Sequence, residues 1–232
     1  MSHTGDRVVA VIPAFNEASV LGKVLSAIPS QVGGMEVVAV VIDDGSTDRT
    51  SEIAQSHGAR CIRHVLNLGV GAATRTGLRA AKQLDAGVVV TIDADGQHDP
   101  AEIESLVRCL LDNQLDVVIG SRILQPYGMP ISRIAANLLL NAITFVVYGK
   151  VVSDSQSGFK AFSRASLDVI ELESAGYEIC SEIIGEIVRN KLNYKSLPVK
   201  AVYTEYSQAK GQHFLNGINL ILQMFVRMLR RV

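Results

Sequence analysis

The feature that most constrains this chain is a regular alternation of short apolar runs and stretches of helical periodicity over its first 125 residues. The runs are continuous and rich in β-branched residues, which is typical of strands buried on both faces of a sheet. We expect strands over Val8–Ile12, Met35–Ile42, Ala59–His64, Gly87–Ile92 and Asp116–Gly120. We expect helices over Ala18–Ile28, Thr47–His57, Val70–Leu84 and Pro100–Asp112. This order predicts an α/β fold with a mainly parallel sheet and helices on both faces.

The second half of the chain is less regular. We expect an apolar helix, a Ser- and Gly-rich loop leading into a short strand, a further helix and a further strand, over Ser132–Tyr148, Ser153–Phe162, Tyr177–Asn190 and Lys195–Tyr203 respectively. A polar loop over Glu205–Gln212 then precedes an amphipathic terminal helix over Phe214–Val232.

Composition excludes several classes of protein. The chain has 22 Lys and Arg against 23 Asp and Glu, so it has no overall basic field for nucleic acid. Its three cysteines include no C-x-x-C pair, which argues against a disulfide framework or structural zinc and for thiols in a reducing compartment. The mean hydropathy is high, +0.25. The apolar stretch Ile134–Tyr148 is nevertheless shorter than the roughly 20 residues of a membrane span, and no signal peptide is expected.

Two carboxylates follow the expected fourth strand, in Asp93-Ala94-Asp95. In an extended segment, side chains two residues apart point the same way. With Gln97 they offer the hard oxygen ligands that Mg²⁺ or Mn²⁺ prefers, and such an ion would hold phosphates. The alternative for an isolated D-x-D is an ordinary turn, since Asp and Gly are common in turns.

Other polar groups follow the other expected strands. Asp43 and Asp44 end the second strand and suit contact with a base or ribose, whereas Ser46–Asp48 suit capping of the next helix. Arg122 ends the fifth strand and suits a diphosphate, although an Arg there is also a common surface residue. Gly71 lies in a small-residue loop that a nucleotide can approach closely. No P-loop or G-x-G-x-x-G motif is present.

Four of these sites together resemble glycosyltransferase family 2, and most closely its dolichyl- or polyprenyl-phosphate sugar synthases. The resemblance covers about residues 7–200, and its most specific string is Asp93-Ala94-Asp95-x-Gln97-His98-x-Pro100. The other matching elements are Pro13-x-Phe15-Asn16-Glu17, Asp43-Asp44-Gly45-Ser46-x-Asp48-x-Thr50, Gly120-Ser121-Arg122, the residues Ser132, Arg133 and Asn137, and Asp154-x-x-Ser157-Gly158-Phe159-Lys160.

The resemblance implies a GT-A fold and a role for each matching residue. Nucleotide-sugar contacts would come from Pro13, Ala14, Phe15, Glu17, Asp43, Asp44, Gly71, Asp93 and Ala94. Asp93, Asp95 and Gln97 would hold the metal, and Arg122 would contact the diphosphate. Ser132, Arg133 and Lys210 would hold the phosphate of a lipid acceptor. The implied catalytic residues are thus Asp95, Arg122, Arg133 and Lys210.

The implied activity is inverting transfer of a hexose from a UDP- or GDP-sugar to polyprenyl phosphate, with Mg²⁺ or Mn²⁺. Residues 1–212 would form one catalytic domain, with a nucleotide half over about 7–125, an acceptor half over about 126–212 and a terminal helix over 213–232. The protein would be peripheral on the cytoplasmic face of a membrane and could form a homo-oligomer, with no nucleic-acid partner.

The sequence departs from the subgroup near its end, where an Arg usually precedes the lysine that Lys210 replaces. Transfer to a sugar hydroxyl therefore stays open, with Glu178 and Glu182 as candidate bases. Their spacing of four residues favours a solvated helix face instead, which is what we expect for both. A nucleotidyltransferase is a further alternative, but its basic, glycine-rich first loop is absent. A non-catalytic membrane-associated subunit is another.

Overall fold

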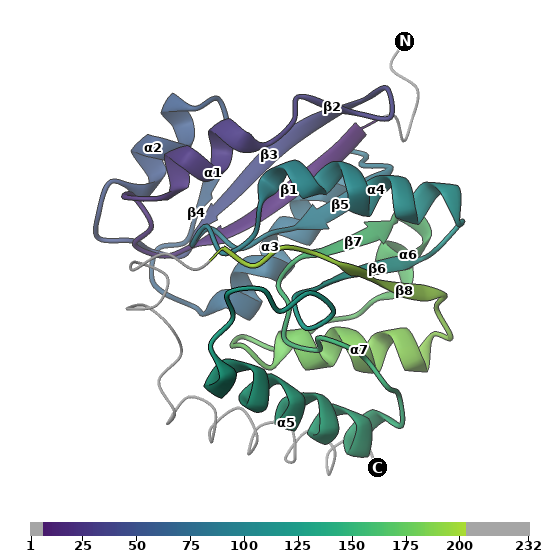
Figure 1. Ribbon diagram of the computed structural model, residues 1–232. Coiled ribbons are helices and arrows are strands. Elements are labelled where there is room, and N and C mark those ends of the chain that lie inside the picture. The colour runs from purple at the N-terminus through teal and green to yellow at the C-terminus, as the bar shows by residue number, and fades with distance from the viewer. Residues whose placement is uncertain (1–6, 203–232) are drawn as a thin grey trace.

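The computed structural model of the protein describes residues 7–202 (Figure 1). Its strands are β1 (Arg7–Ala14), β2 (Gln31–Val32), β3 (Met35–Asp43), β4 (Arg60–Arg63), β5 (Val88–Thr91), β6 (Val117–Ser121), β7 (Lys160–Ser163) and β8 (Tyr194–Pro198). Its α-helices are α1 (Leu21–Ala27), α2 (Thr50–Ser56), α3 (Val70–Gln83), α4 (Ile103–Asp112), α5 (Ile131–Tyr148), α6 (Arg164–Val169) and α7 (Ile179–Arg189). A short 3₁₀ turn, η1 (Pro100–Glu102), leads into α4.

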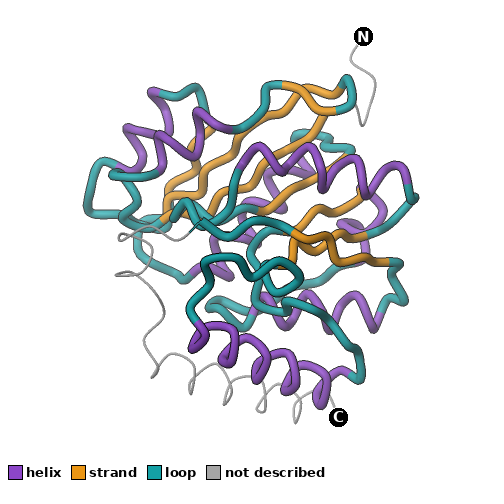
Figure 2. Tube along the Cα trace, in the orientation of Figure 1, coloured by secondary structure: helices purple, strands orange, loops and turns teal. Residues whose placement is uncertain are grey.

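The strands form a single sheet in the order β2-β3-β1-β5-β7-β6-β8, and β4 also pairs with β3 (Figure 2). The pairs β1–β3, β1–β5, β3–β4 and β6–β8 are parallel. The mainly parallel sheet predicted from the sequence is therefore confirmed. Since β5 and β6 point the same way, the carboxyl ends of β1, β3, β5 and β6 lie along one edge of the sheet.

Strand β7 runs antiparallel between β5 and β6. Its first residue, Lys160, stands opposite Thr91 of β5 on one side and Ile119 of β6 on the other. The loop before β7 therefore reaches the sheet at the same edge where β5 and β6 end. This places residues 154–160 beside the ends of β5 and β6.

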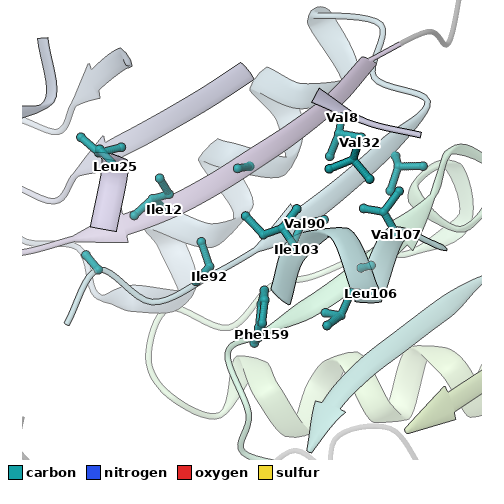
Figure 3. Close-up of a cluster of buried hydrophobic side chains, with 14 of the residues drawn as sticks. Val8, Ile12, Leu25, Val32, Val90, Ile92, Ile103, Leu106, Val107 and Phe159 are labelled. Atoms are coloured by element: carbon teal, nitrogen blue, oxygen red, sulfur yellow. The ribbon is translucent and has the colours of Figure 1, made fainter. Parts of the chain in front are cut away.

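Helices cover both faces of the sheet because successive strand residues point to opposite sides. On one face, Val8, Ala10 and Ile12 pack with residues of α1 and α4 (Figure 3). On the other face, Val9 and Val11 pack with residues of α3, α6 and α7. Nearly all of these side chains are fully buried. Both faces of β1 are therefore apolar, which explains its continuous apolar run.

The expected elements are found with shifted ends, while β2 and α6 are absent from the sequence prediction. The helix expected over Ala18–Ile28 forms over Leu21–Ala27, and the one expected over Thr47–His57 begins at Thr50. The strand expected over Lys195–Tyr203 ends at Pro198, because proline has no N–H to continue a ladder. The expected terminal helix over Phe214–Val232 lies outside the described residues.

Helix α5 differs from the expectation in length. It begins at Ile131, and its 18 residues have a mean hydropathy of 1.5. Among residues 7–202 it is the one helix long and apolar enough to cross a membrane by length and composition. The helix is three residues longer than the apolar stretch Ile134–Tyr148, and the expectation that this stretch does not span a membrane stays a prediction. Only Thr144 of α5 is buried, and the helix packs beside α7 on the outside of the molecule (Figure 1).

Candidate active site at the carboxyl edge of the sheet

The loop after β1 is tied to the loop after β3. The backbone N–H of Asn16 donates to Ser46 Oγ at 2.9 Å, and Asn16 Oδ1 accepts from the Thr47 N–H at 2.8 Å. The Glu17 N–H donates to Thr50 Oγ1 at 2.9 Å. Asn16 has a positive φ of 54°, a conformation that Asn tolerates better than most residues. These contacts hold the two loops together as one wall of the site.

The four residues expected to contact a nucleoside in the first loop have different exposures. Pro13 lies inside β1, opposite Ile42, and Ala14 is buried beside it. Glu17 is also buried, whereas Phe15 is 39% exposed. An aromatic ring exposed at the end of a parallel strand suits stacking on a base. Phe15 is therefore the best-placed of the four for direct contact with a nucleoside.

Asp43 shapes the loop after β3. Its carboxylate accepts from the Ser46 N–H at 2.9 Å, bonds the Ser51 hydroxyl and lies 3.7 Å from Arg63 Nε. Its exposed fraction is zero, and its expected direct contact with a ligand stays a prediction. Ser46–Asp48 were expected to cap the next helix. Of these, Asp48 bonds the first residue of α2, because its Oδ1 accepts from the Thr50 N–H at 3.0 Å.

Asp44 organises the loop that precedes α3. Its two carboxylate oxygens accept from the Leu68 N–H at 3.0 Å and the Gly69 N–H at 2.8 Å. His64 Nδ1 also lies 2.7 Å from Asp44 Oδ1. These three bonds leave part of the lone-pair capacity of Asp44 unused. Its contact with a base or ribose stays a prediction.

Gly71 is covered by the chain itself. Its N–H donates to the Ala175 carbonyl at 2.7 Å, and the Ala72 N–H donates to the same oxygen at 3.1 Å. A Cβ on Gly71 would lie 2.5 Å from the Ser174 carbonyl oxygen. The close approach predicted at this glycine is therefore made by residues 174–176. The structure gives a packing reason for Gly71 and no support for its expected nucleotide contact.

The two carboxylates after β5 have separate surroundings. Asp95 accepts from the Gln97 N–H at 3.0 Å and from Gln97 Nε2 at 2.6 Å. Asp93 lies against Gly158, where a Cβ would be 2.3 Å from both carboxylate oxygens. Only glycine leaves room for the Asp93 carboxylate at that position. Ala94 between them is buried and holds the turn against the core.

The charge at this pair favours a cation. Burial and the neighbouring charge of Asp95 raise the pKa of Asp93 to about 6, against the opposing effects of Arg122 and Lys160. Two carboxylates that repel each other in this way are stabilised by a bound cation. The described residues include no group of three or more His, Cys, Asp or Glu arranged to hold a metal. The donor set still fits Mg²⁺ or Mn²⁺, because Mg²⁺ commonly takes one or two carboxylates together with substrate phosphates.

His98 lies beneath Asp93. Its Nε2 is 3.7 Å from Asp93 Oδ2, and its ring centroid is 5.1 Å from that of Phe159. Neither ring nitrogen has a hydrogen-bond partner among the described residues, and the side chain is fully buried. Burial and the charge of Arg122 lower the pKa of His98 to about 3, so the imidazole is neutral at pH 7.

Arg122 is held by Asp154. Asp154 Oδ2 accepts from the Arg122 N–H at 3.1 Å and from Arg122 Nε at 2.8 Å, and Asp154 Oδ1 accepts from Nη2 at 3.0 Å. Burial acts to raise the pKa of Asp154, but the charge and hydrogen bonds of Arg122 hold it below its ordinary value. A planar guanidinium fixed by such a bidentate pair is well oriented for a phosphate.

Sequence reasoning gave no role to Asp154 or Lys160. Both belong to the Asp154-x-x-Ser157-Gly158-Phe159-Lys160 string, which was the available signal. Lys160 is buried, and its Nζ donates to the Ser157 carbonyl. The positive charge of Lys160 acts to lower the pKa values of Asp93 and Asp154 and so favours the ionised form of both carboxylates, although burial and Asp95 still raise the pKa of Asp93 overall.

The residues expected to hold the acceptor lie at the start of α5 and beyond the described chain. Ser132 is exposed and Arg133 half-buried in the first turn of that helix. Lys210 lies outside the described residues. The range 7–202 therefore tests only the position of the first two, and their contact with a phosphate stays a prediction.

The two glutamates considered as bases are engaged by backbone amides. Glu182 is fully buried, and its carboxylate accepts from the Glu173 N–H at 3.0 Å and the Ser174 N–H at 2.9 Å. Glu178 Oε1 accepts from the Gly176 N–H at 3.1 Å. The expectation of a solvated face is wrong for Glu182, because this side of α7 packs on the loop at 173–176.

Comparison with known proteins agrees with this geometry. The model of the family described as "Glycosyl transferase family 2" matches residues 9–170. A UDP-N-acetylglucosamine–dolichyl-phosphate N-acetylglucosaminyltransferase from Methanococcus voltae is 34% identical over 244 residues, covering 96% of each chain. Polyprenol monophosphomannose synthase from Mycolicibacterium smegmatis is 27% identical over 236 residues, covering 94% of this chain and 84% of that protein.

The fold is similar to that of glucosyl-3-phosphoglycerate synthase from Mycobacterium tuberculosis in complex with Mn²⁺ and UDP-glucose. The TM-score is 0.72 at 23% identity, over 98% of this chain and 79% of that one. A second structure of that enzyme, with Mg²⁺ and UDP, gives a TM-score of 0.68 at 26% identity, over 95% and 79%. The expected GT-A-like architecture is thus confirmed. The family match, the relatives and the motifs at the carboxyl edge agree, and the chain is a glycosyltransferase that belongs to glycosyltransferase family 2.

Proposed function

We propose that the protein transfers a hexose, with inversion, from a UDP- or GDP-sugar to a polyprenyl phosphate of the dolichyl type. The observation that carries this is the bidentate Arg122–Asp154 pair beside the Asp93 and Asp95 carboxylates. A diphosphate leaving group needs positive charge near its oxygens, which a bound metal ion would supply, and the guanidinium that Asp154 orients would add hydrogen bonds to them. Relatives named as dolichyl- and polyprenyl-phosphate sugar transferases support the acceptor class.

In this proposal the donor lies across the ends of β1, β3 and β5. Phe15 stacks on the base, and Asp44 with the amides it orients faces the ribose. Asp93, Asp95 and Gln97 would hold Mg²⁺ or Mn²⁺, which would supply further positive charge to the diphosphate. Structures of an enzyme with this fold contain Mn²⁺ or Mg²⁺ with UDP-glucose or UDP, which supports both choices.

The acceptor phosphate is bound by Ser132, Arg133 and Lys210. A phosphate oxygen attacks the anomeric carbon, the bond from that carbon to the donor diphosphate breaks, and the nucleoside diphosphate leaves with the electron pair. A phosphate monoester has a second pKa of about 6 and is already ionised at pH 7, so it needs no strong base. Proximity and orientation are then the main contribution of the protein.

The alternative is transfer to a sugar hydroxyl, which requires a general base. The two glutamates considered for that role accept hydrogen bonds from backbone amides, and Glu182 has no exposed surface. Asp154 is paired with Arg122. These engagements favour a phosphate acceptor, which is the choice we make.

The membrane surface is the proposed place of action, on the cytoplasmic face. Helix α5 carries the expected phosphate residues in its first turn, and its outward side is apolar, with Ile131 85% and Val146 71% exposed. A helix with one apolar face lying in the interface plane would bring Arg133 to the level of the headgroups. We propose residues 1–212 as one catalytic domain, with the terminal helix over 213–232 as a second membrane contact.

The test uses labelled UDP- and GDP-sugars, Mn²⁺ or Mg²⁺, and a short-chain polyprenyl phosphate. Label is expected to enter the lipid fraction with the wild-type protein. Asp95→Ala is expected to abolish transfer, while Arg108→Ala on the exposed side of α4 serves as the matched control and retains full activity. Transfer of label to a sugar hydroxyl acceptor but not to the lipid would overturn the proposed acceptor. Lack of transfer from every donor by folded protein would overturn the activity.

A further inference from the structure

Helix α5 turns polar side chains toward the protein. Asn141 and Thr144 lie three residues apart, on the side of the helix that packs against α7 and the loop at 153–155. Thr144 is buried, and among residues 7–202 its hydroxyl bonds within the helix alone, to the Leu140 carbonyl at 2.8 Å. Asn141 differs from it, because both ends of the Asn141 amide bond a segment outside the helix.

Asn141 bridges the backbone on either side of Asp154. Its Nδ2 donates to the Ser153 carbonyl at 2.7 Å, and its Oδ1 accepts from the Ser155 N–H at 2.8 Å. A neighbouring strand holds a chain by accepting from one backbone N–H and donating to a nearby carbonyl. The Asn141 amide makes the same two bonds on either side of one residue and so fixes that residue. The residue fixed in this way is Asp154, whose exposed fraction is zero.

Asp154 in turn fixes Arg122 by the three hydrogen bonds described above. The backbone N–H of Arg122 is among its donors, so both the chain path and the guanidinium plane at residue 122 depend on the position of Asp154. The path from α5 to the site is therefore continuous and short: Asn141, the backbone at 153–155, Asp154 and Arg122. Its links are hydrogen bonds of ordinary length at both ends, joined by the covalent chain through Asp154.

We propose that Asn141 is a positioning residue for the transfer reaction, which holds Arg122 in place through the backbone on both sides of Asp154. This inference rests on the proposed function, since Arg122 is there the contact to the donor diphosphate. It adds that α5 and Arg122 form one hydrogen-bonded unit. The helix that presents an apolar surface to the outside thus also sets the position of the guanidinium.

The first measurement is the affinity for UDP in the presence of Mn²⁺, without any acceptor. Asn141→Leu removes both hydrogen bonds at nearly constant volume and is expected to weaken UDP binding about tenfold, with Mn²⁺ affinity unchanged. In the transfer assay we expect kcat to fall up to about 100-fold, as misplacement of a catalytic group by about 1 Å does. Thr144→Val is the matched control, a buried polar residue of the same helix face, and is expected to leave both values unchanged.

The second measurement is a double-mutant cycle with Arg122→Ala. If Asn141 acts through Arg122, Asn141→Leu has no further effect on UDP affinity in the Arg122→Ala background. Additive effects of the two changes, or no effect of Asn141→Leu alone, would overturn the inference. Asn141→Gln keeps the donor and acceptor groups and is expected to recover about tenfold of the lost kcat, which a purely structural role would not produce.

Failure of the proposed function gives a different result. If the activity itself fails, wild-type protein and Arg122→Ala bind UDP equally and no labelled product forms with either. If only the proposed acceptor fails, label enters a sugar hydroxyl product and the UDP results stay as described above. If Asn141→Leu does not fold, as judged by its melting temperature, Asn141→Asp enters the same cycle. It keeps the acceptor for Ser155 and loses the donor to Ser153, so an effect on UDP affinity that vanishes with Arg122→Ala supports the inference, and any other result overturns it.

Discussion

Helices α4 and α5 belong to the two halves of the chain and turn opposite kinds of side chain toward the solvent. In α4, the apolar residues Ile103, Leu106 and Leu110 are buried, while Glu104 and Arg108 are exposed. In α5, Asn141 and Thr144 face the protein, and the exposed large side chains are apolar: Ile131, Leu138, Leu139, Phe145 and Val146.

This difference shows that two kinds of force place the two helices. Burial of apolar surface holds α4 on the sheet, as for most helices of globular proteins. Helix α5 buries less apolar surface within residues 7–202, where Leu140, Ile143 and Val147 are half-buried. Its specific attachments there include the two hydrogen bonds of Asn141. A contiguous apolar patch exposed on a protein surface is typical of an interaction surface. In the proposed function, lipid would cover the apolar side of α5, as the sheet covers the apolar side of α4.

The largest expected effect concerns the burial of apolar side chains in α4 compared with α5. Leu106→Ala in α4 removes a fully buried side chain and is expected to lower the free energy of unfolding by about 2–5 kcal/mol. Leu139→Ala in α5, at a side chain that is 57% exposed, is expected to cost less than about 1 kcal/mol. Urea denaturation without lipid measures both. Equal costs would show that α5 is placed by the same force as α4.

The next effect tests the surface of α5. Leu139→Asp combined with Val146→Asp is expected to weaken binding to vesicles of anionic lipid at least tenfold, because each apolar side chain buried in the lipid contributes about 1 kcal/mol or more. Leu111→Asp is the matched control, since Leu111 is 44% exposed on α4. Flotation of the full chain measures the bound fraction. Loss of binding by the α4 variant alone would contradict the comparison.

A pH titration is expected to affect metal binding at Asp93 and not vesicle binding through α5. The pKa of Asp93 is raised to about 6, so the carboxyl is protonated below that pH and cannot ligate a cation. The dissociation constant for Mn²⁺ is therefore expected to rise about tenfold per pH unit below pH 6, with release of one proton on binding. Helix α5 contains no carboxylate, so vesicle binding through it is expected to be unchanged over that range. Calorimetry in two buffers measures the proton release. Asp93→Asn should remove it.

The smallest effect concerns the polar side of α4. Arg108 Nη2 and Glu104 Oε1 are 2.7 Å apart, but both side chains are about half exposed. Arg108→Ala is therefore expected to change the free energy of unfolding by no more than about 0.5 kcal/mol. The same urea experiment measures it. A loss above about 2 kcal/mol would show that the charged side of α4 contributes as much as its buried side.

The fold of the first 125 residues could be predicted from the sequence because its signals are local. A continuous apolar run such as Val8–Ile12 identifies a buried strand, and parallel strands bring their carboxyl ends to one edge. From these two rules alone, Asp93, Asp95 and Arg122 are expected to lie at the same edge of the sheet. Their motifs also matched the family, which the comparisons confirm.

The remainder depends on contacts between distant residues. Asp154 and Arg122 are 32 positions apart, and nothing near either residue indicates the other. Glu182 was expected on a solvated face, because its spacing from Glu178 does not reveal that a loop covers α7. Asp43 and Gly71 have the residue types of a ligand site, but they bond their own chain. These hydrogen bonds shape the loops of the candidate site, and the expected ligand contacts of both residues stay predictions.

The position of β7 has a consequence for how the chain becomes a folded protein. Within the part of the chain that the structure describes, β6 pairs with β7 and β8 alone, and β5 pairs with β1 and β7 alone. A nascent chain that has reached residue 125 therefore has β6 made but nothing to pair it with, and β5 has one open edge that invites pairing with other chains. The sheet closes only when residues 160–163 emerge and join the two parts. Lys160 and Gly158 arrive with that strand, so the candidate site is assembled at the same moment as the sheet.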